Sequence, residues 1–145
     1  MRTILLVEDS EDDADLTLRA FRNSGLDCKI VLVRDGRQAL DYIFDDAARD
    51  RNVPLGLILL DLKLPCVSGL EVLRALRNSP KGQQIPVVVM SCSTEEADIS
   101  ASYDLGANSY IRKPVDFDKF IKTIESLGTY WLSLNELPVS GRRLP

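Results

Sequence analysis

The sequence contains no histidine, and this absence excludes several kinds of active site. Without an imidazole the chain cannot form a Ser-His-Asp or Cys-His nucleophilic site, a histidine-ligated metal site or a phosphohistidine. Its three cysteines, Cys28, Cys66 and Cys92, are odd in number and widely spaced, which fits neither a disulfide framework nor a four-ligand zinc site. Any chemistry must therefore rest on carboxylates, hydroxyls and lysine.

Long apolar runs and an excess of basic charge are also missing. The N-terminal apolar run has only four residues, 4–7, before two acids, which is too short for the core of a signal peptide or for a spanning helix. We therefore expect a cytoplasmic protein with no membrane anchor. The formal net charge of −4 argues against broad electrostatic attraction to nucleic acid or to anionic membranes.

Apolar residues are present in the amount that one compact domain needs. They make up 45% of the 145 positions, a length and a share typical of a single core. We expect one domain over residues 1–134, followed by an irregular tail over 135–145.

Short apolar runs alternate with helical patterns along this domain. We expect strands at 3–7, 29–33, 58–60, 86–90 and 109–112, with an amphipathic helix after each. Five strands that alternate with five helices predict an α/β fold with a doubly wound parallel sheet.

Capping residues mark several of the expected helix ends. Asp35, Ser93 and Asp116 have the type and spacing of N-caps, and Gly25 and Gly106 are placed to end helices. The polar stretch 45–56 and the segment 65–69 are expected to be loops.

One apolar run ends in a single carboxylate. The residues Ile58, Leu59 and Leu60 lead directly to Asp61. Strands buried on both faces of a parallel sheet are continuously apolar, and functional residues of such sheets lie just beyond the carboxyl ends of the strands. We therefore expect Asp61 to lie at that edge of the sheet.

Polar side chains follow three of the other predicted strands. Glu8 and Asp9 follow the first strand, Ser91 the fourth and Lys113 the fifth. Because all the strands are expected to be parallel, these side chains should converge with Asp61 at one edge.

This set of side chains suits phosphoryl transfer to a carboxylate. Three close carboxylates repel one another unless a cation lies among them, and an all-oxygen set favours Mg²⁺. A carboxylate such as Asp61 can act as a nucleophile toward phosphorus once its charge is offset. Lys113 and Ser91 can then bind phosphoryl oxygens through an ammonium and a hydroxyl.

Four motifs together resemble the receiver domain of two-component response regulators. The resemblance covers about residues 3 to 130 and implies a flavodoxin-like fold. The motifs are Val7-Glu8-Asp9, Leu60-Asp61 with Pro65 and Gly69, Val89-Met90-Ser91, and Tyr110-Ile111-Arg112-Lys113-Pro114.

The resemblance implies a role for each of these residues. Asp61 would accept a phosphoryl group from the histidine of a sensor histidine kinase, with Mg²⁺ held by Glu8, Asp9, Asp61 and the backbone carbonyl of Lys63. Lys113 matches the lysine of the family motif, and Ser91 and Tyr110 match the pair that rearranges on phosphorylation. Lys63 stands at a variable position that tunes the lifetime of the phosphoryl group in the family.

A narrower resemblance concerns the insertion before the third strand and the end Tyr130-Trp131-Leu132. Both are similar to single-domain regulators that partner cyanobacterial and bacterial phytochromes. This implies a red-light-responsive kinase as partner and a homodimer through the last helix. The expected dimer surface comprises Phe120, Ile124, Tyr130, Trp131 and Leu134, although core packing is an equal alternative for the last three.

Other interpretations remain open at this point. Tyr110 could simply be a strand aromatic that packs on the last helix. The whole chain could be a flavin or nucleotide carrier, but an acidic segment stands where such proteins place a phosphate-binding loop after the first strand. It could also be a receiver-like dimerisation scaffold that is not phosphorylated, although the intact acidic residues and Lys113 count against this.

We expect a signalling switch that catalyses only its own phosphorylation and dephosphorylation rather than an enzyme. Only 31 residues follow Pro114, and the last helix needs most of them, so no DNA-binding module is expected. Output would come from contacts with other proteins.

Overall fold

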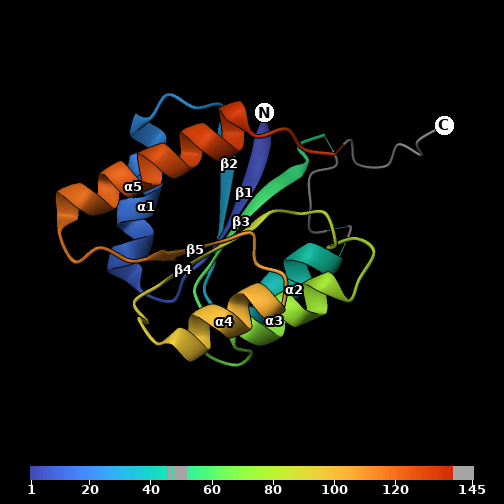
Figure 1. The fold of residues 1–145 in the computed structure, drawn as a ribbon. Helices are drawn as coiled ribbons and strands as arrows, with labels where there is room; N and C mark the ends of the chain where they lie inside the picture. The colour runs from blue at the N-terminus through green and yellow to red at the C-terminus, as the bar shows by residue number, and fades with distance from the viewer. Residues whose placement is uncertain (46, 48–51, 139–145) are drawn as a thin grey trace.

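A computed structural model describes residues 1–45, 47 and 52–138 of the chain, and it has the predicted α/β architecture (Figure 1). All five strands are parallel, in the order β2-β1-β3-β4-β5. The strands are β1 (Arg2–Val7), β2 (Cys28–Val33), β3 (Leu55–Leu60), β4 (Val87–Ser91) and β5 (Ser109–Arg112). The helices are α1 (Glu11–Asn23), α2 (Gly36–Phe44), α3 (Gly69–Arg77), α4 (Glu96–Asp104) and α5 (Phe117–Thr129).

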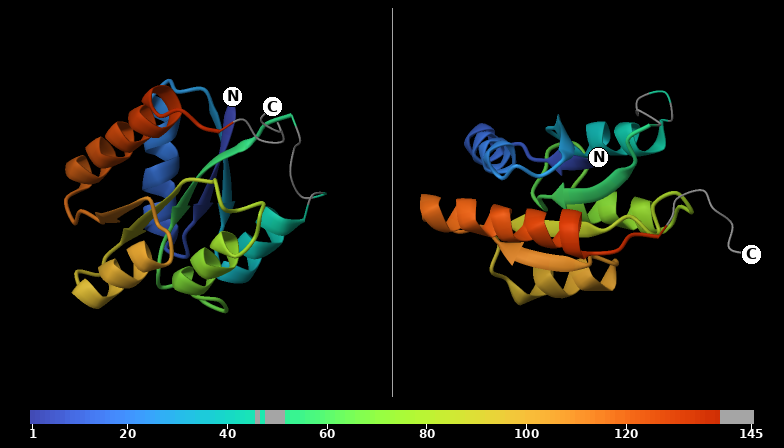
Figure 2. Two further views of the ribbon diagram at one scale, coloured as in Figure 1. Left: turned by 45° about the vertical axis from the view of Figure 1, so that its right-hand side comes forward. Right: turned by 90° about the horizontal axis from the view of Figure 1, so that it is seen from above.

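The helices cover both faces of the sheet. Helices α1 and α5 lie side by side on one face, and α2, α3 and α4 lie on the other (Figure 2). Successive residues of β3 enter opposite cores: Ile58 packs with α2 and α3, whereas Leu59 packs with α1 and α5. Because both faces are buried, the strand is apolar at every position, as the sequence indicated.

Two of the three predicted N-caps are confirmed. The side chain of Asp35 accepts a hydrogen bond from the backbone of Gln38, and Asp116 accepts one from Lys119. The prediction for Ser93 is wrong, because α4 begins at Glu96 and no side chain caps it. The hydroxyl of Ser93 instead donates to Asp98 Oδ2 at 2.5 Å.

The two glycines predicted to end helices do so in the left-handed conformation. Gly25 follows α1 with φ of 73°, and Gly106 follows α4 with φ of 97°. Side chains other than hydrogen are strained at such angles, which explains glycine at both positions.

The bounds of β1, β2 and β4 differ from the predicted ones by one residue, and two other boundaries differ by more. Strand β3 begins at Leu55, inside the stretch expected to be a loop, because Thr3 donates to the carbonyl of Pro54 and pairs this segment with β1. Helix α5 gives way to a π-helical turn, η2 (Tyr130–Leu134), before the chain ends its helical course. Part of the expected loop, 46 and 48–51, and part of the expected tail, 139–145, lie outside the described residues.

Within the part of the chain that the structure describes, no helix combines the length and the apolar character that crossing a bilayer requires.

The side chain of Arg77 joins three segments on one side of the molecule. Its Nε donates to the carbonyl of Gly106 at 2.9 Å, and its Nη1 donates to those of Gly82 and Ile85 at 2.6 and 2.8 Å. Its Nη2 donates to Asn108 Oδ1 at 2.9 Å. Arg77 thereby fastens the end of α3 to the segment before β4 and to the α4–β5 loop.

We expect Arg77→Lys to lower the free energy of unfolding by about 2–3 kcal/mol, because an ammonium cannot reproduce the planar fork of donors and leaves carbonyl groups unpaired. Urea denaturation measures the change. Arg74→Lys, on the exposed face of the same helix, is the matched control and should leave stability unchanged. Equal midpoints for both variants would contradict a stabilising role for the Arg77 hydrogen bonds.

Candidate functional site

Three carboxylates meet at the carboxyl edge of the sheet. Glu8 and Asp9 follow β1, and Asp61 follows β3, the neighbouring strand. One oxygen from each of these side chains lies within 4.8 Å of the others. Glu8 and Asp61 are buried, with 4% and 9% of their surface exposed, whereas Asp9 is exposed.

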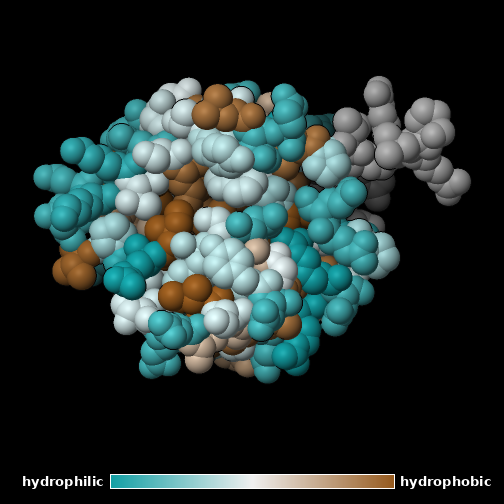
Figure 3. Space-filling model, in the orientation of Figure 1, coloured by the Kyte–Doolittle hydropathy of each residue, from teal (hydrophilic) through white to brown (hydrophobic). Residues whose placement is uncertain are grey.

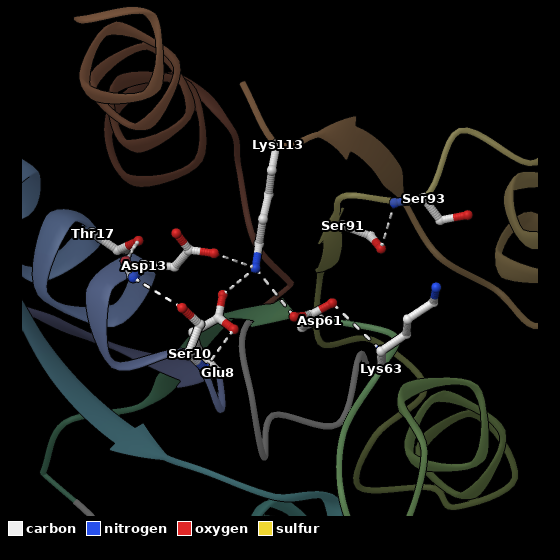
Figure 4. A network of polar contacts seen from close by, with 9 residues as sticks. All are labelled: Glu8, Ser10, Asp13, Thr17, Asp61, Lys63, Ser91, Ser93 and Lys113. Carbon is white, nitrogen blue, oxygen red and sulfur yellow. Dashed lines mark hydrogen bonds and ion pairs between the residues drawn. The ribbon is translucent and has the colours of Figure 1, made fainter. Parts of the chain in front are cut away.

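Lys113 points into this group of carboxylates (Figure 4). Its Nζ lies 2.6 Å from Glu8 Oε1, 3.1 Å from Asp61 Oδ2 and 2.9 Å from Asp13 Oδ2. Only 5% of the lysine side chain is exposed. Its backbone N–H donates to the carbonyl of Ser91 at 2.8 Å, which fixes the point from which the side chain extends.

The sequence alone predicts no role for Asp13. It lies in the first turn of α1 among six acidic residues between positions 8 and 15, and composition does not distinguish it from its neighbours. The one local signal is Ser10, which caps the helix by accepting a hydrogen bond from the backbone N–H of Asp13. This cap fixes where the turn begins and therefore which acid faces the site.

The pKa values of both Glu8 and Lys113 are raised here, but by different causes. Burial raises the pKa of the Glu8 carboxyl to about 7; the hydrogen bond and charge of Lys113 oppose this shift, and the charge of Asp61 adds to it. For Lys113, burial alone would lower the pKa, but hydrogen bonds to Glu8 and Asp13 and the charge of Asp61 raise it above the ordinary value. The lysine is therefore charged at neutral pH.

The cluster formed by the Glu8, Asp9 and Asp61 carboxylates suits a hard divalent cation. Its donors are all oxygens, and the raised pKa of Glu8 reflects a buried negative charge that one ammonium does not fully offset. A dication held by Glu8, Asp9 and Asp61 would favour the ionised form of Glu8.

The segment after β3 folds closely around Asp61. The backbone N–H of Asp61 donates to Val7, and that of Lys63 donates to Asp61 Oδ1 at 3.4 Å. The Lys63 side chain extends away from the carboxylates (Figure 4). A Cβ at Gly69 would lie 2.2 Å from the carbonyl oxygen of Asp61, so only glycine allows this approach.

Ser91 and Tyr110 are connected through Ser93, which the sequence predicts only as a helix cap. Ser91 is buried at the end of β4, and its Oγ accepts a hydrogen bond from the backbone N–H of Ser93 at 3.2 Å. The hydroxyl of Tyr110 donates to the carbonyl of Ser93 at 2.9 Å. Tyr110 packs with the core beneath α2 and α3, so the alternative that it packs on the last helix is wrong.

A sequence model described as the response regulator receiver domain matches residues 4–125. This chain belongs to the response regulator receiver family. Receivers are signalling domains. The matched residues include the three clustered carboxylates as well as Ser91, Tyr110 and Lys113.

Several relatives of this receiver match over nearly its whole length. Probable methanogenesis regulatory protein FilR2 of Methanothrix harundinacea is 42% identical over 135 residues, which cover 93% of this chain and 86% of that protein. Response regulator Rcp1 of Synechocystis sp. is 34% identical over 139 residues, which cover 96% of this chain and 95% of Rcp1.

Two solved structures match closely. The Mn²⁺-bound form of Rcp1 has a TM-score of 0.85 at 35% identity and covers 96% of this chain and 100% of that chain. The phosphorylated cyanobacterial phytochrome response regulator RcpA has a TM-score of 0.88 at 38% identity and covers 95% of this receiver and 99% of that chain. A divalent ion in Rcp1 is consistent with the fit of this receiver's carboxylates to such an ion.

The expected dimer surface needs a correction. Phe120 and Ile124 are only 3% and 0% exposed and pack against the sheet, because the helical period places both on the inward face of α5. They are unavailable to a partner. Tyr130 and Leu134 are 47% and 69% exposed, and Trp131 is half-buried with its ring edge-on to that of Tyr130.

We expect Asp9→Asn to weaken Mg²⁺ binding by this receiver by roughly tenfold or more, because one exposed carboxylate of the three is lost without disturbing the buried ion pair. Isothermal titration calorimetry measures the affinity. Asp12→Asn removes an equally exposed charge from the same acidic segment and serves as the control. The metal assignment would be wrong if both variants bound Mg²⁺ with equal affinity.

Proposed function

We propose that Asp61 accepts a phosphoryl group and that this receiver thereby acts as a phosphorylation switch. The observation that carries the proposal is the buried ammonium of Lys113, 3.1 Å from Asp61 Oδ2 at the open edge of the sheet. A buried cation beside a carboxylate is placed to bind an anion that becomes attached to that carboxylate. The similarity to RcpA, whose crystal structure is of the phosphorylated protein, supports the same role.

The transfer uses this chain's own residues in distinct roles. A carboxylate oxygen of Asp61 attacks phosphorus, the P–N bond to the donor histidine breaks, and the imidazole nitrogen keeps the bonding electron pair. Lys113 binds one phosphoryl oxygen, and the hydroxyl of Ser91 donates to another. Mg²⁺, held by the carboxylate group and the Lys63 carbonyl, would neutralise negative charge between the nucleophile and the phosphoryl group.

The response to phosphorylation begins at Ser91 in this proposal. To donate to a phosphoryl oxygen its hydroxyl must move toward Asp61, which breaks its hydrogen bond with the Ser93 backbone. The hydroxyl of Tyr110 is hydrogen-bonded to the carbonyl of Ser93, so Tyr110 moves with Ser93. Ser93 is also bonded to Asp98 in the first turn of α4, so the change reaches a surface helix that can bind a partner.

We propose a sensor histidine kinase of the phytochrome type as the donor, and the cytoplasm as the location. Similarity to RcpA and Rcp1 supports the phytochrome partner. FilR2 is more similar in sequence but is named for methanogenesis, so the donor must be tested directly. Phosphotransfer from a red-light phytochrome kinase should be faster than transfer from other sensor kinases. Equal rates would contradict this choice of partner.

Asp61→Asn is expected to abolish phosphorylation by acetyl phosphate, because the amide is not a nucleophile toward phosphorus. Intact mass spectrometry detects the added phosphoryl group. The wild type and Asp41→Asn, an exposed acid on α2, should both be phosphorylated when Mg²⁺ is present and not when it is removed with a chelator.

Binding of beryllofluoride distinguishes this proposal from the alternative of an unphosphorylated dimerisation scaffold. A phosphorylation switch binds it in the presence of Mg²⁺, and Asp61→Asn does not. A wild type that neither binds beryllofluoride nor reacts with acetyl phosphate would favour the scaffold.

We also propose that the receiver forms a homodimer through the end of α5. A shallow pocket there is lined partly by Ile111, Leu127 and Trp131, next to the exposed ring of Tyr130. Hydrophobic areas on the face shown in Figure 3 are small and separate, so that face offers no large apolar patch as an alternative dimer interface.

Tyr130→Ser together with Leu134→Ser should shift the protein to a monomer, because the change removes apolar surface that would be buried between copies. Light scattering coupled to size-exclusion chromatography measures the mass. Tyr103→Ser, which changes an equally exposed tyrosine on α4, is the control and should leave the dimer intact. A monomeric wild type at high concentration would rule out the dimer.

A further inference from the structure

We propose that Asp13 is a positioning residue that holds the Lys113 ammonium over Asp61 during phosphoryl transfer. The inference rests on the proposed function and adds a residue to that site. It starts from the observation that Lys113 Nζ contacts three carboxylates, and that these differ in what else they do.

Two of the three partners of Lys113 have a competing role. Glu8 and Asp61 belong to the group of carboxylates whose oxygens lie close enough to share a metal ion, and Asp13 does not. When a cation and a phosphoryl group occupy the site, Glu8 is shared with the metal and Asp61 becomes an acyl phosphate. Asp13 is then the one carboxylate of the three that remains available to Lys113 alone.

Asp13 is itself held in place from two sides. Its backbone N–H donates to Ser10 Oγ at 3.3 Å, and its carbonyl accepts a hydrogen bond from the buried hydroxyl of Thr17 at 2.8 Å. The carboxylate therefore projects from a fixed turn of α1 toward the lysine (Figure 4). Its side chain is 28% exposed, so solvent screens the pair in part but does not separate it.

The ion pair with Asp13 restricts the directions in which the Lys113 ammonium can point. The ammonium is carried on a flexible four-carbon chain, and each fixed acceptor removes some of its freedom. Without Asp13 the amine keeps its charge but is free to follow Glu8 toward the metal, away from the phosphoryl oxygen that it must meet. Phosphorylation should become slower while metal affinity changes little.

The experiment compares Asp13→Ala with Asp12→Ala, its exposed neighbour on the same turn. Phosphorylation by acetyl phosphate at saturating Mg²⁺ should be about tenfold slower in D13A than in D12A, the size expected for the loss of one partly exposed charge-assisted hydrogen bond. Beryllofluoride binding should weaken by a similar factor, and Mg²⁺ affinity should fall no more than in D12A. Circular dichroism establishes that each variant is folded; if D13A is not, D13N replaces it.

A double-mutant cycle with Lys113→Ala separates positioning from a general effect of charge or stability. If Asp13 acts through Lys113, D13A slows the wild type but has no further effect in the K113A background. Equal effects in both backgrounds, or equal rates for D13A and D12A, would overturn the inference and leave the proposed function standing. A wild type that does not react at all would overturn the proposed function instead.

Discussion

The structure depends on one buried ammonium group that is surrounded by carboxylates. Removing a charge from water is costly unless partners replace the lost hydration, and Lys113 finds three of them. Those partners come from the ends of β1 and β3 and from the first turn of α1. The lysine follows β5, which is separated from β3 by β4, so only a long side chain anchored beside β4 can reach them. The order of the strands therefore requires a side chain as long as that of lysine at position 113.

Two glycines allow the backbone near Asp61 to pack closely. The carbonyl of Asp61 lies against Gly69, and a Cβ at Gly36 would lie only 2.0 Å from the carbonyl of Val67. Both glycines allow backbone segments to approach at distances that no other residue permits. The segment between β3 and α3 is thereby folded back over the site, and Asp61 remains buried while its carboxylate still faces the edge of the sheet.

The sequence predicted the fold because the local signals agreed with one another. Apolar runs of strand length, helix caps such as Asp35 and Asp116, and glycines at helix ends all pointed to one doubly wound sheet. The rule that functional residues follow parallel strands also brought Glu8, Asp9, Asp61 and Lys113 to one edge.

Sequence reasoning failed where three-dimensional contacts choose between equivalent residues. Asp12 and Asp13 are the same residue type in the same turn, and only the direction of the helix makes one of them a partner of Lys113. Ser93 has the spacing of a helix cap, but its backbone is held by Ser91 and Tyr110 and its hydroxyl is used by Asp98. Phe120 and Ile124 were counted toward an outer surface although their helical period places them inside.

The two ends of α4 are attached to different parts of the molecule. Just beyond its carboxyl end, Gly106 and Asn108 are fastened by the guanidinium of Arg77 to the end of α3. At its amino end, the hydroxyl of Ser93 accepts a hydrogen bond from the backbone N–H of Glu95 and donates one to Asp98. A displacement of Ser93 would therefore act directly on the first turn of α4, whereas the loop after its last turn is held by Arg77.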